Sequence, residues 1–311
     1  MNIGVIGVGG WGKNHVRALS ELNVLKCICD VDQVRASELA KKYNINNYTS
    51  LDDMLNNERL DGIILSTPTV THFELAKRIL EKGIPLLIEK PFTSTINEGK
   101  ELIKLAENKH LLLTAGYIER FNPVVKYTKD LIANKRLGNV LMLEFHRENR
   151  RPARIKDVGI ILDTSVHDID TALYLLDEFP NVVFARSGKV NGEHEEYVSI
   201  ILGFNDKNAF LLSNWITPKR LRHFSVICKD GIINGNFITQ ELSIEEESNT
   251  IIPRLEYKEP LMLELSNFIN SIDGKEEPLV KPEDALNTLR VADATILSSK
   301  TGSQIYLSAY K

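Results

Sequence analysis

Along the first 115 residues, short apolar runs alternate with longer segments whose apolar residues recur at helical spacing. Runs this short, separated by amphipathic helices, are typical of the parallel strands of a doubly wound sheet. The expected strands are residues 2–6, 24–29, 46–48, 61–66, 85–89 and 111–115, and the expected helices are residues 12–21, 33–43, 71–82 and 94–108. The pattern predicts an α/β domain over residues 1–120.

The rhythm changes after Phe121, where strands begin to follow one another with turn signals between some of them. Such a succession is typical of a mostly antiparallel sheet. The expected strands are residues 139–147, 181–190, 196–204, 208–216, 221–228 and 232–237, and the expected helices are residues 123–134, 163–177, 260–272 and 282–298. These helices can cover one face of the sheet, so residues 121–311 are predicted to form an α+β domain with an open sheet.

The strand expected at residues 208–216 carries apolar side chains on both faces, because Phe210, Leu212 and Asn214 alternate with Leu211, Ser213 and Trp215. The face that no helix covers should therefore find a partner. We expect a homodimer or homotetramer that assembles through the C-terminal sheet.

The composition excludes several classes of protein. The 311 residues are 43% hydrophobic and carry a net charge of −4 without long charged runs, so a phosphate-backbone surface for nucleic acid has no support. No apolar stretch approaches the length of a membrane span and no export signal opens the chain, so a cytoplasmic protein without a membrane partner is expected. Cys27, Cys29 and Cys228 lack zinc-site spacing, and no metal site is predicted.

The first strand leads directly into Gly7-Val8-Gly9-Gly10-Trp11-Gly12, which fits the G-x-G-x-x-G pattern of a Rossmann dinucleotide cradle. Backbone N–H groups and the positive end of the following helix can bind a pyrophosphate there. Asp30 ends the second strand, 18 residues beyond Gly12, where its carboxylate can bond the ribose hydroxyls of NAD and repel the 2′-phosphate of NADP. Because of Arg35, NADP remains an alternative but less favoured cofactor. The alternative is a Gly-rich turn beside an exposed acid.

Glu89-Lys90-Pro91 stands at the end of the fifth expected strand, at the sheet edge where doubly wound folds bind ligands. Lys90 could contact a substrate there, with Pro91 restraining its backbone in either the cis or the trans form. The alternative is an ordinary surface lysine at a strand end.

Asp163 and His167 lie four positions apart at the start of an amphipathic segment, a spacing that puts both on one face of an α-helix. An imidazole oriented by a carboxylate suits proton exchange with an alcohol. The alternative is a helix N-cap at Asp163 and a buried structural histidine at position 167.

Several motifs in order give the chain a resemblance to the glucose-fructose oxidoreductase, inositol dehydrogenase and MocA-like family. They are the Gly-rich turn, Thr67-Pro68 with His72, Glu89-Lys90-Pro91, Gly116-Tyr117 with Arg120-Phe121, and Asp163 with His167. The resemblance implies NAD-dependent oxidation of a secondary sugar or cyclitol hydroxyl.

Three catalytic roles are implied by the resemblance. His167 would take the hydroxyl proton, Lys90 would stabilise the charge that develops on the same oxygen, and Asp163 would orient the histidine or a neighbouring hydroxyl. The implied cofactor contacts are Gly7, Gly9, Gly10, Trp11, Gly12, Asp30, Ser66, Thr67, Pro68, His72, Glu89 and Lys90. The implied substrate contacts include Lys90, Tyr117, Arg120, Asp163 and His167.

Two arginine-rich segments bear on the substrate. The first contains Arg147, Arg150, Arg151 and Arg154, and the second contains Arg220 and Arg222. Guanidinium groups suit diphosphates, so Arg150, Arg151, Arg154, Arg220 and Arg222 are predicted to bind a nucleotide sugar. The alternative is a solvated loop with salt bridges.

The stretch from residue 157 to residue 170 resembles the branch of the family that oxidises UDP-N-acetylglucosamine at C3. A dehydrogenase of a free sugar or inositol is the alternative. A non-enzymatic NAD-binding regulator is disfavoured, because it need not keep Lys90, Asp163 and His167 together and the chain shows no DNA-binding appendage. Ile160, Ile161 and Leu162 depart from the glycines common in the family and leave the substrate open.

Overall fold

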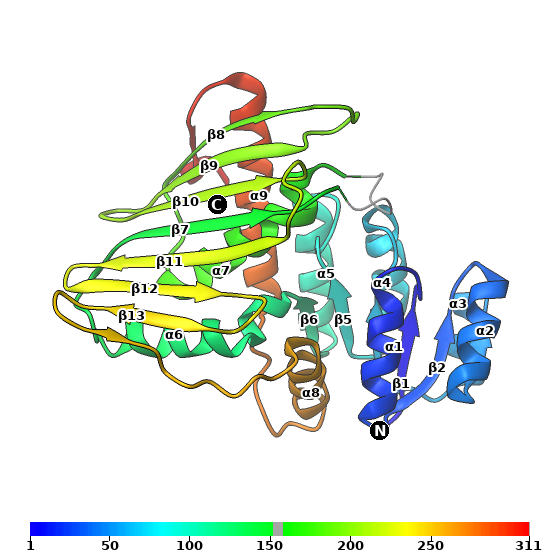
Figure 1. The fold of residues 1–311 in the computed structure, drawn as a ribbon. Coiled ribbons are helices and arrows are strands. Elements are labelled where there is room, and N and C mark those ends of the chain that lie inside the picture. Colours follow the sequence, from blue (N-terminus) through cyan, green and yellow to red (C-terminus); the bar gives the residue numbers. More distant parts are fainter. Residues whose placement is uncertain (152–157, 311) are drawn as a thin grey trace. The chain divides into compact units, whose positions relative to one another are not determined.

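The computed structural model describes residues 1–151 and 158–310 (Figure 1). The chain divides into two compact units. Residues Met1–Tyr117 and Leu261–Leu286 form the first, and Ile118–Pro260 and Asn287–Lys311 form the second.

The first unit contains a six-stranded parallel sheet in the order β3-β2-β1-β4-β5-β6, which confirms the predicted Rossmann fold (Figure 1). Its strands are β1 (Ile3–Ile6), β2 (Leu25–Cys29), β3 (Asn46–Tyr48), β4 (Gly62–Leu65), β5 (Leu86–Glu89) and β6 (Leu113–Gly116). Its helices include α1 (Gly12–Glu21), α2 (Gln33–Tyr43), α3 (Leu51–Asn57), α4 (His72–Glu81) and α5 (Ile96–Asn108). Because the strands are parallel, the loops that follow them gather at one sheet edge.

Two helices of the first unit differ from the sequence expectations. Helix α3 is short and was not predicted; the Ser50 side chain caps it by accepting a bond from the Asp53 amide. Helix α8 (Pro260–Ile272) was expected to cover the C-terminal sheet, but it packs in the first unit. Phe268 and Ile272 lie against Gly62 of β4, where a Cβ would come within 2.7 Å of the Ile272 side chain. The missing side chain of Gly62 makes room for this helix.

The second unit contains a nine-stranded sheet in the order β14-β13-β12-β11-β7-β10-β9-β8-β15. Strands β7 and β10 pair in parallel and the other neighbours are antiparallel, which confirms the mostly antiparallel α+β class. The strands are β7 (Val140–Glu148), β8 (Val182–Gly188), β9 (Tyr197–Gly203), β10 (Asn208–Asn214), β11 (Leu221–Cys228), β12 (Gly231–Asn236), β13 (Leu242–Glu245), β14 (Thr250–Ile251) and β15 (Ile305–Tyr306).

Helices cover one face of this sheet: α6 (Pro123–Ala133), α7 (Val166–Leu176) and the C-terminal part of α9 (Pro282–Thr301) (Figure 1). A hydrogen bond ties α9 to β8, because Ser298 accepts from the Ala185 amide at 2.9 Å. On the opposite face Phe184, Ile201 and Phe210 lie in register on neighbouring strands, each 37–40% exposed. The sheet therefore has one buried face and one face with an exposed apolar row.

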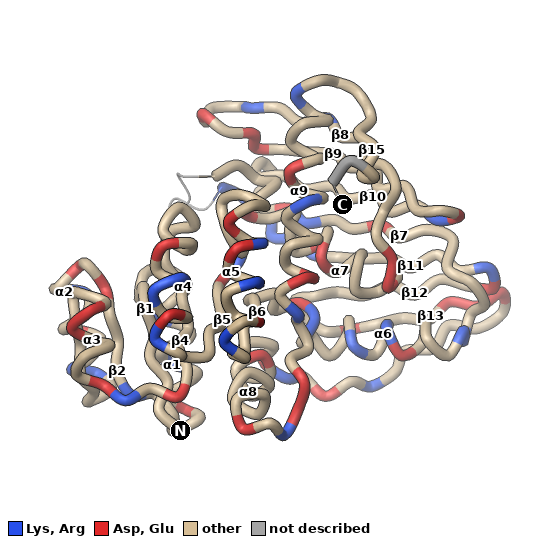
Figure 2. The backbone as a smooth tube through the Cα atoms, turned by 180° about the vertical axis from the view of Figure 1, so that it is seen from behind, with Lys and Arg blue, Asp and Glu red and all other residues tan. Residues whose placement is uncertain are grey.

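Figure 2 shows that positions of Lys and Arg and positions of Asp and Glu are interspersed along the described parts of both units. Among residues 1–151 and 158–310, no helix has the length and apolar character needed to cross a membrane. No group of three or more metal-ligating side chains was found in the same residues.

Candidate active site

The Gly-rich loop after β1 has the close backbone packing of a dinucleotide cradle. Gly7 has a φ of +81°, and a Cβ there would come within 2.5 Å of the Ser66 carbonyl oxygen. A Cβ on Gly12 would overlap the Gly7 carbonyl. At Gly9, by contrast, the nearest described atom to a Cβ is the Arg35 Nη1, 4.0 Å away. The loop is therefore tight on its protein side and open at Gly9, as a dinucleotide requires.

Asp30 follows β2 and is bonded to the same loop. One carboxylate oxygen accepts from the Val8 amide at 2.8 Å and the other from the Asp32 amide at 2.9 Å. Arg35 lies beside it, with Nη1 3.2 Å from Oδ1. Asp30, the acid predicted to favour NAD, is therefore paired with Arg35, the residue that left NADP as an alternative cofactor.

His72, at the start of α4, joins the loops that follow β4 and β5. Its Nε2 lies 2.9 Å from the Thr67 carbonyl oxygen and its Nδ1 lies 3.0 Å from that of Pro91. Burial lowers the pKa of the imidazole despite these carbonyl neighbours. The Thr67 hydroxyl accepts from Thr71 at 2.8 Å, and Pro68 precedes the helical turn. His72 therefore holds together the loop after β4 and the loop after β5, which both carry predicted cofactor contacts.

Lys90 follows β5, is half-buried, and precedes a cis peptide bond to Pro91. Glu89 is buried, and its carboxylate accepts hydrogen bonds from Trp11 and His15 of α1. Tyr117, at the end of the first unit, is also buried. The loop that carries Lys90 is thus bonded to the helix that begins at the Gly-rich motif.

In the second unit, Asp163 lies in a π-helical turn, Ile161–Ser165, directly before α7. The sequence expectation of one regular helix over residues 163–177 is therefore wrong at its start. Thr164 donates to Asp163 at 3.0 Å and accepts from the Trp215 indole at 3.2 Å, which ties the turn to the end of β10. π-turns inside helices are frequent at functional sites. Asp163 and His167 are half-buried.

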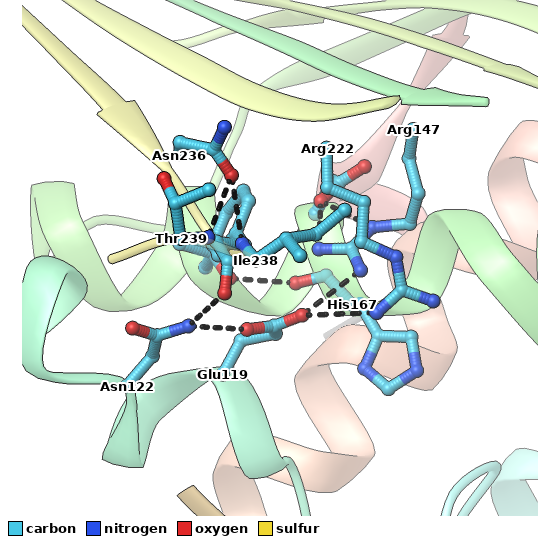
Figure 3. A network of polar contacts seen from close by, with 11 residues as sticks. Glu119, Asn122, Arg147, His167, Arg222, Asn236, Ile238 and Thr239 are labelled. Carbon is cyan, nitrogen blue, oxygen red and sulfur yellow. Dashed lines mark hydrogen bonds and ion pairs between the residues drawn. The ribbon is translucent and has the colours of Figure 1, made fainter. Parts of the chain in front are cut away.

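A buried network of charges lies beside His167 in the sequence and in the view of Figure 3. Arg147, on β7, is 1% exposed, and its Nε and Nη2 lie 2.9 and 2.7 Å from Asp168 Oδ1. Its Nη1 donates to Glu119 Oε1 at 2.9 Å. Burial opposes the charge of Arg147, but the two carboxylates outweigh it and raise the pKa of the guanidinium. Arg147 thus links the residue after His167 to β7.

Arg222, on β11, takes part in this network more weakly. Its Nη1 lies 3.7 Å from Glu119 Oε1, and its buried Nε has no hydrogen-bond partner among the described residues. Burial and then the like charge of Arg147 lower the pKa of Arg222. Its side chain is 26% exposed, and in Figure 3 the Arg222 guanidinium and the His167 ring extend toward the same part of the view. Arg222 is therefore a cation that an arriving anion would stabilise.

The other predicted substrate arginines fall into three groups. Arg120 is buried and forms a bidentate pair with Asp170, at 2.7–3.1 Å. Arg151 donates to Glu196 at 3.2 Å and lies over the Trp215 ring. Arg150 and Arg220 are exposed. Arg154 lies outside the described residues.

The sequence reasoning missed the internal partners of these arginines. Arg147 was counted in the first arginine-rich segment without a predicted substrate contact, and its position two residues after buried Phe145 places it on the inward face of β7. That alternation was a usable signal. Glu119 and His15 had no comparable signal, because their partners lie 28 and 74 positions away along the chain.

The cradle of the first unit and the Lys90 loop have the features of an NAD-dependent oxidoreductase domain. Comparison with known protein families shows which family the chain belongs to. Residues 1–117 match the family model "Oxidoreductase family, NAD-binding Rossmann fold" and residues 129–307 match "Oxidoreductase family, C-terminal alpha/beta domain". The chain belongs to this glucose-fructose oxidoreductase, inositol dehydrogenase and MocA family, whose members are oxidoreductases, and it has an NAD-binding Rossmann domain.

Several named dehydrogenases and oxidoreductases are similar to this chain. The chain is 27% identical to the UDP-N-acetylglucosamine 3-dehydrogenase of Acidithiobacillus ferrooxidans over 88% of each sequence, and its structure matches that protein with a TM-score of 0.90 over 97% of this chain and 98% of the other. It is 24% identical to the myo-inositol 2-dehydrogenase of Thermotoga maritima, over 91% of this chain and 92% of that one. An Agrobacterium radiobacter oxidoreductase in complex with NAD+, 17% identical, shares the fold over 100% of this chain and 99% of the other, with a TM-score of 0.91.

Proposed function

We propose that this NAD-binding oxidoreductase oxidises the C3 hydroxyl of an N-acetylhexosamine carried on a nucleotide. The observation that supports this substrate best is Arg222, a partly exposed guanidinium with one long contact to Glu119. A cation held this way gains most from a phosphate oxygen of the substrate. The similarity to a UDP-N-acetylglucosamine 3-dehydrogenase points the same way.

The chain's own residues supply the proton chemistry, while NAD accepts the hydride when bound. In this proposal His167 takes the proton of the reacting hydroxyl, and Asp163 orients His167 or a neighbouring hydroxyl. The Lys90 ammonium donates a hydrogen bond to the same oxygen and stabilises its developing negative charge.

NAD is the proposed cofactor in preference to NADP. Asp30 carries a negative charge at the end of β2, where a 2′-phosphate would be repelled. Arg35 offsets part of that charge through its 3.2 Å contact, so NADP binding should be weaker without being abolished.

A free sugar or inositol is the second candidate substrate, and the internal pairing of three other arginines is the observation in its favour. Arg147, Arg120 and Arg151 are engaged with Asp168, Asp170 and Glu196, so fewer arginines are available for a diphosphate than the sequence suggests. Exposed Arg150 and Arg220, together with Arg222, are the remaining described ligands in the nucleotide-sugar proposal.

Assembly through the open sheet face is part of the proposal. The exposed row of Phe184, Ile201 and Phe210 would be buried in a homodimer or homotetramer. Phe210→Asp should then yield monomers in light scattering at micromolar concentration. A wild-type protein that is monomeric under the same conditions would refute this assembly.

A panel of substrates tests the proposed activity. NADH absorbance should rise faster with UDP-N-acetylglucosamine than with free N-acetylglucosamine, glucose or myo-inositol, each at equal concentration. Faster oxidation of a free sugar or inositol would replace the substrate and keep the dehydrogenase. Absence of NAD reduction with every compound would count against the proposed reaction.

A further inference from the structure

Three hydrogen-bond donors converge on the carboxylate of Glu89. The indole Nε1 of Trp11 donates to Oε1 at 2.7 Å, and His15 Nε2 lies 2.6 Å from the same oxygen. The backbone amide of Lys90 donates to Oε2 at 3.2 Å. Glu89 ends β5, whereas Trp11 and His15 lie one turn apart at the start of α1. The cluster therefore joins the helix of the Gly-rich loop to the loop that carries Lys90.

His15 is held in this cluster by its contact with Glu89. The His15 side chain is fully buried, and its Nδ1 has no partner among the described residues. Because an ionised carboxylate can only accept, His15 Nε2 is the donor of the 2.6 Å contact with Glu89 Oε1.

Glu89 is a buried carboxylate held by donors from Trp11, His15 and the Lys90 amide. Burial alone would raise its pKa, but the hydrogen bond and electrostatic attraction of His15, the charge of Lys90 and the bond from Trp11 outweigh that effect and lower the pKa of the carboxyl group. Gly116 leaves the room that the carboxylate needs, because a Cβ there would lie 2.9 Å from it. The anion lies next in sequence to Lys90, which is the only lysine or arginine in residues 86–95.

We propose that Glu89, Trp11 and His15 are positioning residues that orient Lys90 relative to the Gly-rich loop. The backbone of Lys90 is fixed by Oε2, and its ammonium is attracted by the carboxylate charge. Because the same carboxylate is bonded to the first turn of α1, Lys90 keeps a fixed position relative to the pyrophosphate cradle of the Gly-rich loop. This inference rests on the proposed role of Lys90 at the reacting oxygen.

The first test measures Lys90 directly in the cofactor-free protein. Acetic anhydride is applied briefly, and the acetylation rates of Lys90 and Lys26 are read by peptide mass spectrometry. Glu89→Gln, Trp11→Phe and His15→Leu should each change the Lys90 rate about threefold or more while leaving Lys26 unchanged, since a side chain without its electrostatic partner samples other orientations. His15→Gln, which can place a donor near the Nε2 position, should restore a rate near that of the wild type.

Glu58 provides a matched control in the same unit. It is another carboxylate, with a side chain 5% exposed, that accepts from Asn46 at 2.7 Å and Tyr48 at 2.9 Å and lies 3.7 Å from a lysine, Lys26. Glu58→Gln should change the reactivity of Lys26 and leave that of Lys90 as in the wild type. If Glu58→Gln altered Lys90 as much as Glu89→Gln does, the effect would be general destabilisation and the proposal would fail.

Kinetics give the second test once a substrate is known. Glu89→Gln should lower kcat roughly 10- to 100-fold, with the Kd for NAD and the KM for the sugar within about threefold of the wild type. His15→Gln should recover most of the loss seen in His15→Leu. Unchanged Lys90 acetylation in Glu89→Gln overturns the positioning role, whereas altered acetylation in a protein that oxidises none of the sugars would count against the proposed function alone.

Discussion

Two buried carboxylates, one in each unit, are stabilised by different chemistry. Glu89 in the first unit accepts hydrogen bonds from the Trp11 indole, the His15 imidazole and the Lys90 backbone amide. Glu119 in the second unit faces two guanidinium groups, those of Arg147 and Arg222, at 2.9 and 3.7 Å. Hydrogen bonds from Trp11 and His15 fix the position of the Glu89 carboxylate, whereas the unequal distances from Glu119 to the two arginines leave the more distant one, Arg222, available to another anion.

Breaking the arginine network should have the largest effect. Arg147→Met leaves Asp168 and Glu119 without their closest cation, and removal of one partner of a buried ion pair costs about 3–5 kcal/mol. Urea unfolding followed by circular dichroism measures the loss. Arg254→Met, at an exposed arginine, should cost less than about 0.5 kcal/mol. Equal losses in the two variants would show that the network contributes nothing special.

Lys90 and His167 are the two residues proposed to act on the reacting hydroxyl. Lys90→Met and His167→Asn should each lower kcat by roughly 10²-fold or more, because each removes a charge or proton acceptor at that oxygen. Calorimetric titration with NAD and thermal unfolding should stay close to the wild type. A variant with near-normal turnover would remove its residue from the mechanism.

The weakly held arginine provides a smaller and more selective effect. Arg222→Ala should raise the KM for UDP-N-acetylglucosamine by a factor that corresponds to a loss of about 1.5–3 kcal/mol, the range for a charge-assisted contact. The KM for a free sugar should change less. Arg151→Ala tests whether a paired arginine also binds substrate, since it is engaged with Glu196. An Arg222→Ala enzyme with equal KM changes for both kinds of substrate would argue against a phosphate contact.

The smallest expected effect concerns cofactor choice. Asp30→Ala should narrow the preference for NAD over NADP by about 1 kcal/mol, because the 2′-phosphate would no longer meet a carboxylate and Arg35 would lose its acidic partner. Titration of both cofactors into both proteins measures the ratio. Tighter binding of NADP by the unaltered protein would make Arg35 the principal determinant.

The fold was predictable where local chemistry fixed the element ends. Helix α2 runs over residues 33–43 as expected, because the Asp32 side chain caps its start and Asn44 ends it in the left-handed conformation. Helix α8 could not be assigned to its unit, since its contacts with Gly62 join residues about 200 positions apart. Amphipathic spacing shows that a helix has a buried face without saying which sheet covers it.

The candidate site shows the same limit. Motif order singled out Lys90, Asp163 and His167 as candidates, and strand alternation could have shown that Arg147 points inward. Which carboxylate each arginine meets depends on tertiary pairing: Asp168 lies 21 positions and Glu119 28 positions from Arg147. A run of arginines in a sequence therefore overstates the positive charge available to a substrate.

The π-helical turn at Ile161–Ser165 determines how Asp163 and His167 are oriented relative to each other about the helix axis. A turn bonded from residue i to i+5 holds one residue more than an α-helical turn, and each residue of an α-helix advances the side chains by about 100°. Deleting Thr164 would let the segment rewind and swing Asp163 by roughly that angle around the axis while α7 kept its own register. The relative orientation of Asp163 and His167 is therefore more sensitive to the gain or loss of a single residue in this turn than to most substitutions nearby.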